Sequence, residues 1–208
     1  MPAAREALLD AAYTALARRP WPTVRMVDVA AAAGVSRQTL YNEFGGKEGL
    51  ARALVRREAD CYLAGVEHAL AAHSDPSERL TAAAEWTASA ARGNALVRAM
   101  LTGCWSERLP TPTLSAAPAA SAVPAQRRAD GPLPSPGDLL AAVRDRAVAA
   151  LSAVSAASAP SGPDADGADL AAACELVFRL ALSCVAAPPG EGGTAELVRD
   201  ALRRHRAV

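Results

Sequence analysis

Aromatic residues are scarce in this chain, at 4% of its 208 residues, although hydrophobic residues together make up 51%. Alanine supplies the difference, and such a composition favours closely packed helices over strands. No convincing strand pattern occurs, and no stretch of roughly 18 or more residues is uninterruptedly apolar, as a membrane span requires. The N-terminus lacks the basic-then-apolar pattern of a secretion signal. We therefore expect an all-α, soluble and cytoplasmic protein with no membrane partner.

Cysteine and histidine are also few, and neither forms a recognisable site. The four cysteines are scattered without a CxxC pair, so we interpret them as small buried apolar residues in a reducing compartment. A redox switch between Cys174 and Cys184 would have to bridge ten helical positions, which disulfide geometry disfavours. The three histidines form no HExxH motif, and no GxSxG, Walker or dinucleotide pattern occurs. The sequence thus predicts no catalytic residue, no metal site and no cofactor, and it disfavours an enzyme.

Formal net charge is zero, which argues against a protein that coats nucleic acid indiscriminately. The charges are unevenly distributed, however. Residues 1–57 hold nine Lys/Arg and five Asp/Glu, whereas residues 58–208 hold thirteen and seventeen. A modest basic excess in the N-terminal part is the electrostatic footprint expected of a DNA-binding segment.

The most informative stretch is TVRMVDVAAAAGVSRQTLYNEFGGK, residues 23–47. Its pattern predicts two short helices joined by a tight turn, the first capped by Thr23 and ended by Gly34. Ser36 would cap the second helix. The side chains expected to face the core from this second part are Val35, Leu40 and Phe44.

The opposite side of the second helix is polar. Forked or amide side chains near a helix N-terminus, with hydroxyls that reach phosphates, are what a helix in a DNA major groove needs. The unit is therefore predicted to be a helix-turn-helix. The residues left on or near its outside are Arg37, Gln38, Thr39, Tyr41 and Asn42.

The motif AxxAGVSxxTLYxxFxxKExL, residues 30–50, resembles the DNA-binding domain of the TetR family of bacterial repressors. The resemblance covers roughly residues 5–57. It implies a three-helix helix-turn-helix head, residues 1–50, joined by a long helix to a helical ligand-binding and dimerisation bundle, residues 51–208. It also implies a ligand-responsive repressor that binds a palindromic double-stranded operator as a homodimer. An activator fits the residues equally well.

The resemblance also implies roles for individual head residues. Lys47, which opens the long helix predicted to run to about residue 73, is expected to contact a phosphate. Glu43 departs from the family pattern, and we expect it to point away from DNA or to pair with a nearby arginine. The full set of predicted DNA-binding residues is Thr23, Arg25, Ser36, Arg37, Gln38, Thr39, Tyr41, Asn42 and Lys47.

Two further helices are predicted at residues 75–92 and from residue 94 onward. The second is expected to carry Leu96, Met100 and Cys104 along one edge and Val97, Leu101 and Trp105 along the other. Both helices carry large side chains in an otherwise alanine-rich body, and pockets in helical bundles are lined this way. We expect an apolar or aromatic small-molecule effector to bind there, with plain core packing as the alternative. The predicted pocket residues are Trp86, Met100, Leu101 and Trp105.

Residues 106–137 contain seven prolines and are interpreted as a linker or mobile loop, with a lid as a less supported alternative. Arg127 and Arg128 within it are interpreted as a solvated pair. Helical periodicity resumes at Asp138, and a second breaker is expected at residues 159–167.

The last two predicted helices span residues 168–186 and 194–206. The first is apolar nearly all round, so it should be covered by the core on one side and by a partner on the other. The resemblance implies that both helices form a four-helix dimer interface. The residues predicted at this interface are Leu176, Leu180, Leu197 and Ala201.

A helical adaptor that uses the head for protein contacts is the remaining alternative. Salt-dependent binding to a palindromic DNA would separate it from the regulator.

Overall fold

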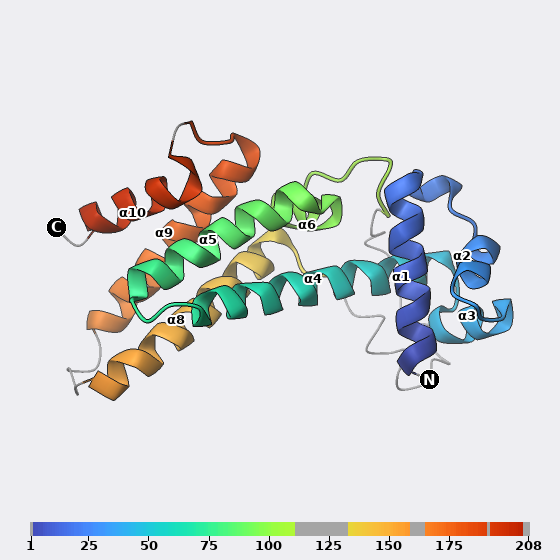
Figure 1. Ribbon diagram of the computed structural model, residues 1–208, viewed down its shortest axis with the longest axis horizontal. Helices are drawn as coiled ribbons and strands as arrows, with labels where there is room; N and C mark the ends of the chain where they lie inside the picture. The colour runs from blue at the N-terminus through green and yellow to red at the C-terminus, as the bar shows by residue number, and fades with distance from the viewer. Residues whose placement is uncertain (1, 111–132, 159–164, 191, 206–208) are drawn as a thin grey trace. The chain divides into compact units, whose positions relative to one another are not determined.

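The computed structural model describes residues 2–110, 133–158, 165–190 and 192–205 (Figure 1). Across these residues every regular element is a helix, as the composition predicts. The chain divides into two compact units, one formed by Met1–Ala59 with Trp105–Leu133 and the other by Asp60–Cys104 with Pro134–Val208. The predicted boundary at residue 50 therefore lies inside the first unit, and the division falls within the long helix.

The first unit contains α1 (Pro2–Arg18), the short 3-10 helix η1 (Trp21–Thr23), α2 (Met26–Ala32), α3 (Arg37–Phe44) and the start of α4 (Lys47–Ala71). Helix α1 packs against α2 and α3, as expected for a buttress of the helix-turn-helix. The backbone N–H of Trp21 donates to the carbonyl of Arg108 at 2.8 Å, which holds the segment after α6 in this unit. Its buried core includes Leu8, Leu9, Ala12, Trp21, Val24, Val29, Ala30, Leu40, Phe44, Leu50, Leu54 and Val55.

The predicted start of α2 at Thr23 is wrong. Thr23 lies in η1, and its hydroxyl donates to the Pro20 carbonyl at 2.8 Å. Helix α2 begins three residues later, after Arg25, which caps it without a side-chain hydrogen bond. The prolines at positions 20 and 22 fix φ, and the turn they favour occupies the hydroxyl that would have capped a helix.

Helix α4 runs from Lys47 to Ala71, close to the predicted 47–73. Its buried row has a spacing of four residues: Leu50, Leu54, Glu58, Tyr62, Val66 and Leu70. Cys61 was expected on the core side but is exposed, because Tyr62 occupies the buried position of that turn.

The second unit contains the remainder of α4, α5 (Pro76–Gly93), α6 (Ala95–Thr102), α8 (Pro136–Ser158), α9 (Ala165–Ala186) and α10 (Gly193–His205). Helix α9 packs against α5, α8 and α10, and α10 also packs against α5 (Figure 1). The unit is therefore a helical bundle with α9 in contact with most of its neighbours. Its buried residues include Leu80, Ala83, Ala84, Ala88, Leu96, Leu139, Val143, Ala147, Val177, Phe178 and Val198.

Side-chain caps mark the starts of α5 and α6. The Asp75 carboxylate accepts from the Glu78 amide at 3.0 Å, as the Asp-Pro-Ser pattern predicts. Asn94 accepts from the amides of Leu96 and Val97. Helix α6 ends at Thr102 because Gly103 takes a left-handed φ of 72°, so the predicted continuation of this helix through Cys104 and Trp105 is wrong.

The C-terminal helices begin earlier than predicted. Helix α8 starts at Pro136 instead of Asp138, since proline is compatible with a first helical position. Helix α9 starts at Ala165, inside the breaker expected at 159–167. Residues 111–132 of the proline-rich stretch, with Arg127 and Arg128, lie outside the described residues, as do residues 159–164 and Arg206.

Helices α4 and α5 make a close contact through Tyr62, Gly65, Trp86 and Thr87. The Trp86 indole N–H donates to the Tyr62 carbonyl at 3.1 Å, and the Tyr62 and Thr87 hydroxyls lie 3.1 Å apart. Burial raises the pKa of Tyr62 to about 12, against the opposing hydrogen bond with Thr87. A Cβ on Gly65 would lie 2.1 Å from the Trp86 ring, so only glycine allows this approach.

We predict that Gly65→Ala destabilises the protein by about 1–2 kcal/mol, because the new methyl displaces the Trp86 ring and breaks its hydrogen bond to Tyr62. The measurement is urea unfolding followed by circular dichroism. Gly93→Ala is the matched control, since nothing lies within 4 Å of that position and helix propensity improves there. In a Trp86→Ala background, Gly65→Ala should no longer reduce the stability. A Gly65→Ala protein as stable as wild type would contradict the close contact between Gly65 and Trp86.

Candidate DNA-binding surface

The start of α3 is fixed by a glycine turn and a serine cap. Gly34 takes a φ of 67°, a left-handed conformation that favours glycine. The Ser36 hydroxyl then accepts from the Thr39 amide at 3.0 Å and lies 2.9 Å from the Thr39 hydroxyl. Both features are as predicted. Together they fix the N-terminus of α3 at Arg37, the first of the polar residues on its outer face.

The outer face of α3 carries the predicted residues. Arg37, Gln38, Tyr41 and Asn42 are exposed and Thr39 is half-buried, while Leu40 and Phe44 are buried. Val35 is only half-buried, so it contributes less to the core than expected. The polar side of α3 therefore faces away from the core of the first unit.

Two of these side chains interact with each other. The Gln38 amide nitrogen donates to the Asn42 side-chain oxygen at 2.8 Å, one helical turn apart. Both residues are exposed on the outer face of α3. Carboxamide side chains carry both hydrogen-bond donors and acceptors, as the edges of DNA bases do.

Arg25 lies just before α2 and is engaged within the chain. Its guanidinium makes two hydrogen bonds to the Asp28 carboxylate, each at 3.1 Å, and Arg19 lies 3.2 Å from the same carboxylate. The hydrogen bond from Arg25 holds the pKa of Asp28 below its ordinary value, against an opposing effect of desolvation. Asp28 also lies in the first turn of α2, where a carboxylate is favoured by the helix dipole.

Lys47 is likewise held by the first unit. Its ammonium donates to the Pro22 carbonyl at 2.9 Å and lies 5.7 Å from the centroid of the Trp21 ring. Burial lowers the pKa of Lys47, with an opposing effect of Glu48. The contact ties the start of α4 to η1, and the phosphate contact expected from the resemblance stays a prediction.

Glu43 pairs with an arginine, as expected. The Arg5 guanidinium on α1 lies 3.8 Å from the Glu43 carboxylate and 4.7 Å from the centroid of the Phe44 ring. Arg5 was not among the predicted site residues. Its neighbours on α3 are far from it in sequence, so no local pattern could have revealed the contact.

The sequence analysis also did not predict that Val27 is exposed. It is 43% exposed on α2, similar to Tyr41 at 41% on α3, and is one of few large apolar side chains left in solvent among the described residues. Its position along the helix could have indicated this exposure, because Val27 lies on a different side of α2 from the buried residues Val29 and Ala30.

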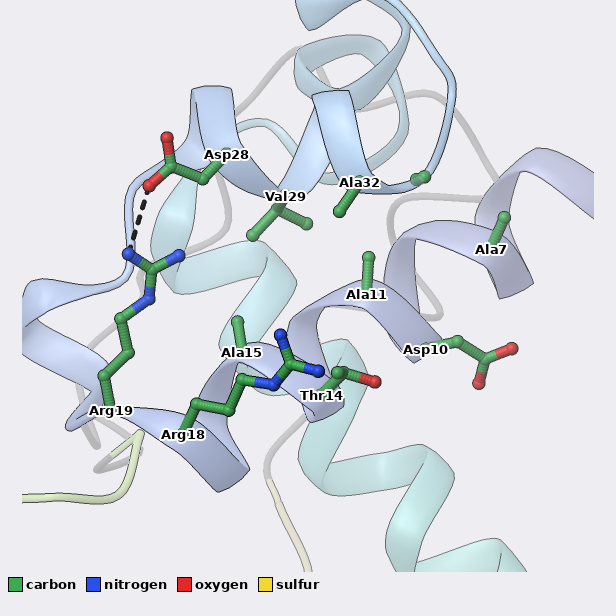
Figure 2. Close-up of a pocket in the computed structure, with 11 residues that line it drawn as sticks. Ala7, Asp10, Ala11, Thr14, Ala15, Arg18, Arg19, Asp28, Val29 and Ala32 are labelled. Carbon is green, nitrogen blue, oxygen red and sulfur yellow. Dashed lines mark ion pairs between the residues drawn. The ribbon is translucent and has the colours of Figure 1, made fainter.

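A groove of about 720 Å³ runs between α1 and α2 in the first unit. Figure 2 shows its alanine side chains, among them Ala7, Ala11, Ala15 and Ala32, and the Arg19–Asp28 ion pair. Alanine methyls are too short to fill the space between two helices, which explains the groove. The sequence indicates this groove through Ala7, Ala11 and Ala15, which are spaced by four residues and therefore lie on one side of α1.

The predicted pocket residues do not share one environment. Met100 and Leu101 are buried in α6, and Trp86 is 38% exposed with its N–H already bonded to Tyr62. Trp105 lies beyond the end of α6 and belongs to the first unit. The expectation that Trp105 continues the helical edge of Val97 and Leu101 is therefore wrong, and the pocket itself stays a prediction.

The predicted dimer residues lie on two helices that pack against each other. Leu176 on α9 is 38% exposed and Leu197 on α10 is 39% exposed, while Leu180 and Ala201 are half-buried. The opposite side of α9 is buried and includes Cys174, Val177, Phe178 and Ala181. The outer side of α9 thus carries the exposed Leu176 next to an ion pair between Arg179 and Glu175.

The cysteines fall into two groups. Cys174 and Cys184 are buried as predicted, and burial raises the pKa of Cys174 to about 11. Cys61 and Cys104 are exposed, contrary to expectation. Across the described ranges no cluster of three or more His, Cys, Asp or Glu side chains could hold a metal ion. Nor does any helix in that part of the chain have the length and apolar character to cross a membrane.

Comparison with known proteins gives matches to the N-terminal region and to the whole fold. A family model described as bacterial regulatory proteins, tetR family, matches residues 8–54. The HTH-type transcriptional regulator AlkX of Mycobacterium tuberculosis is 45% identical over 69 residues, which span 33% of this chain and 33% of that protein. The matched region is thus about a third of the curated relative's length.

Two solved structures share the fold. The TetR family repressor AlkX from a Dietzia species, implicated in biodegradation of n-alkanes, has a TM-score of 0.54 at 21% identity, covering 98% of this chain and 97% of that chain. The regulator FadR from Bacillus subtilis, in complex with stearoyl-CoA, has a TM-score of 0.50 at 16% identity, covering 96% of each chain. Both confirm an all-helical architecture with an N-terminal helix-turn-helix.

Proposed function

We propose that the chain is a ligand-responsive transcriptional repressor of the TetR family of bacterial regulatory proteins, because residues 8–54, which include its helix-turn-helix, match the model of that family. In this proposal it binds a palindromic double-stranded operator as a homodimer. The observation that carries the proposal is α3 itself, a capped helix with a buried apolar side and an outer face of exposed polar side chains.

The outer face of α3 suits major-groove recognition in detail. Arg37 at the first helical position can donate to two acceptors on a guanine edge, and a carboxamide such as that of the exposed Gln38 is the kind of group that pairs with an adenine edge. Tyr41 and Thr39 carry hydroxyls that reach phosphates. Sequence preference therefore resides in Arg37 and Gln38, and backbone affinity in the hydroxyls and Lys47.

Arg25 and Lys47 reach phosphates with N–H donors that their internal contacts do not use. Arg25 donates through Nε and one Nη to Asp28, and Lys47 donates to the Pro22 carbonyl. A guanidinium and an ammonium have further N–H donors, so these contacts can persist while a phosphate binds and counterions are released from DNA. Ser36 and Thr23 act through their turns, which set the positions of α3 and η1.

The homodimer rests on α9 and α10. Two leucines at about two-fifths exposure on packed neighbouring helices form an apolar surface that a second copy would cover. A two-fold dimer presents two α3 helices, which matches an operator with inverted half-sites.

The effector proposed is an apolar or aromatic small molecule bound within the second unit. Met100 and Leu101 supply buried apolar surface there, and Trp86 supplies an aromatic ring. The similar regulator from Bacillus subtilis was solved with stearoyl-CoA, whose acyl chain is apolar. Effector binding would favour a conformation that no longer fits both half-sites.

The DNA prediction separates specificity from affinity. Duplexes selected from a random library by wild-type protein should contain an inverted repeat with half-site centres about 34–36 Å apart, or a multiple of this. Arg37→Ala should lose about 1–3 kcal/mol of preference for the selected duplex over a scrambled one. Lys47→Ala should weaken binding to both and reduce the salt slope by roughly one unit.

Titrations at several salt concentrations measure both effects. Arg98→Ala is the matched control, because it removes the same charge from an exposed position in the second unit. An Arg37→Ala protein that keeps full preference for the selected duplex would refute the assignment, and a wild-type protein that selects no DNA would refute the function.

The dimer prediction concerns Leu176 and Leu180. Replacing either by Asp places a charge in an apolar interface, so the variants should sediment as monomers or become insoluble. Val27→Asp is the control, since it makes the same kind of change at a similarly exposed position in the first unit. Analytical ultracentrifugation that finds a folded wild-type monomer at micromolar concentration would contradict the dimer.

The effector prediction uses tryptophan fluorescence with stearoyl-CoA as the probe. A protein with Trp21→Phe and Trp105→Phe retains Trp86 alone, and its emission should change on titration because Trp86 borders the predicted pocket. A protein that retains Trp21 alone is the control. If the acyl-CoA releases DNA while only the Trp21 signal responds, the pocket has been misplaced.

A further inference from the structure

Arg5 connects α1 to the far end of the recognition helix. Its guanidinium lies 3.8 Å from the Glu43 carboxylate and 4.7 Å from the centroid of the Phe44 ring. Phe44 is the last residue of α3 and is buried, and Gly45 ends the helix in a left-handed conformation. Arg5 therefore contacts α3 where the helix stops, at the end opposite its Ser36 cap.

Glu43 is an unfavourable residue in this place. It lies in the last turn of α3, where the helix dipole disfavours a negative charge. It also lies one turn after Thr39, on the helix proposed to approach phosphates, which repel a carboxylate. A cation beside Glu43 offsets both effects, and Arg5 supplies one from another helix.

The geometry uses both properties of a guanidinium. An arginine can stack its plane on an aromatic ring while its N–H groups face a carboxylate, whereas a lysine ammonium supplies the charge without the planar fork. The stacking fixes the Phe44 ring, and with it the end of α3, against α1. Helix α1 packs more extensively against α2 than against α3.

We propose that Arg5 is a positioning residue for DNA recognition: it holds the C-terminal end of α3 against α1 and offsets the charge of Glu43 without touching DNA. The inference rests on the proposed DNA-binding function. It assigns to α1 a part in setting the angle and charge of the recognition helix.

The test compares Arg5→Gln, Glu43→Gln and the double variant in titrations against the duplex selected by wild-type protein. Arg5→Gln should weaken binding roughly two- to fivefold, the scale of an exposed cation–π contact and ion pair. Glu43→Gln should bind as tightly as wild type or more tightly. In the Glu43→Gln background the added loss from Arg5→Gln should shrink, because the charge to be offset is gone.

The salt dependence separates positioning from a direct phosphate contact. If Arg5 only positions α3, Arg5→Gln leaves the salt slope close to that of wild type, whereas loss of a phosphate contact lowers it by about 0.9. Arg5→Lys should recover part of the affinity, since it keeps the charge near Glu43 but not the stacking on Phe44. This variant also preserves the test if Arg5→Gln folds poorly.

Arg18→Gln is the matched control. It removes the same charge from the same helix, about 20 Å along the axis from Arg5, and should leave affinity close to wild type. An Arg5→Gln loss that is equal with and without Glu43, with a reduced salt slope, would overturn the proposal in favour of a phosphate contact. An Arg5→Gln protein with unchanged affinity would also overturn it, while failure of wild-type protein to select any duplex would instead reject the proposed function.

Discussion

The hydrogen bond from the Thr39 amide to the Ser36 hydroxyl is the contact on which the proposed recognition surface depends. It fixes the first residue of α3, and each residue of an α-helix turns the side chains by roughly 100°. A start displaced by one residue would bring Leu40 out of the core and carry Gln38 toward it. The left-handed Gly34 makes this start possible, because the chain must reverse direction immediately before the cap.

Three positively charged side chains of the first unit have internal partners. Arg25 is bonded to Asp28, Lys47 to the Pro22 carbonyl, and Arg5 lies against Glu43 and Phe44. These contacts orient long side chains that would otherwise lose conformational entropy on binding. The proposed DNA-binding surface is thus partly preorganised.

The failures of sequence reasoning have local physical causes. Thr23 was expected to cap α2, but its hydroxyl is used by the turn that the neighbouring prolines favour. Trp105 was expected to continue α6, but Gly103 takes a left-handed conformation and ends the helix. A capping hydroxyl at Thr23 and the apolar spacing at Trp105 were both valid local signals, but a constraint on the backbone overrode each of them. Cys61 was predicted to be buried but is exposed, because the adjacent Tyr62 lies on the buried side of α4 instead.

The sequence by itself determined the all-helical class, the glycine turn, the Ser36 cap and the polar outer face of α3, because periodicity, capping and turn chemistry act over a few neighbouring residues. Only the tertiary structure decided the contacts between distant segments. The approach of Trp86 to Gly65 and of Arg5 to Glu43 depends on how helices cross, which no local pattern records.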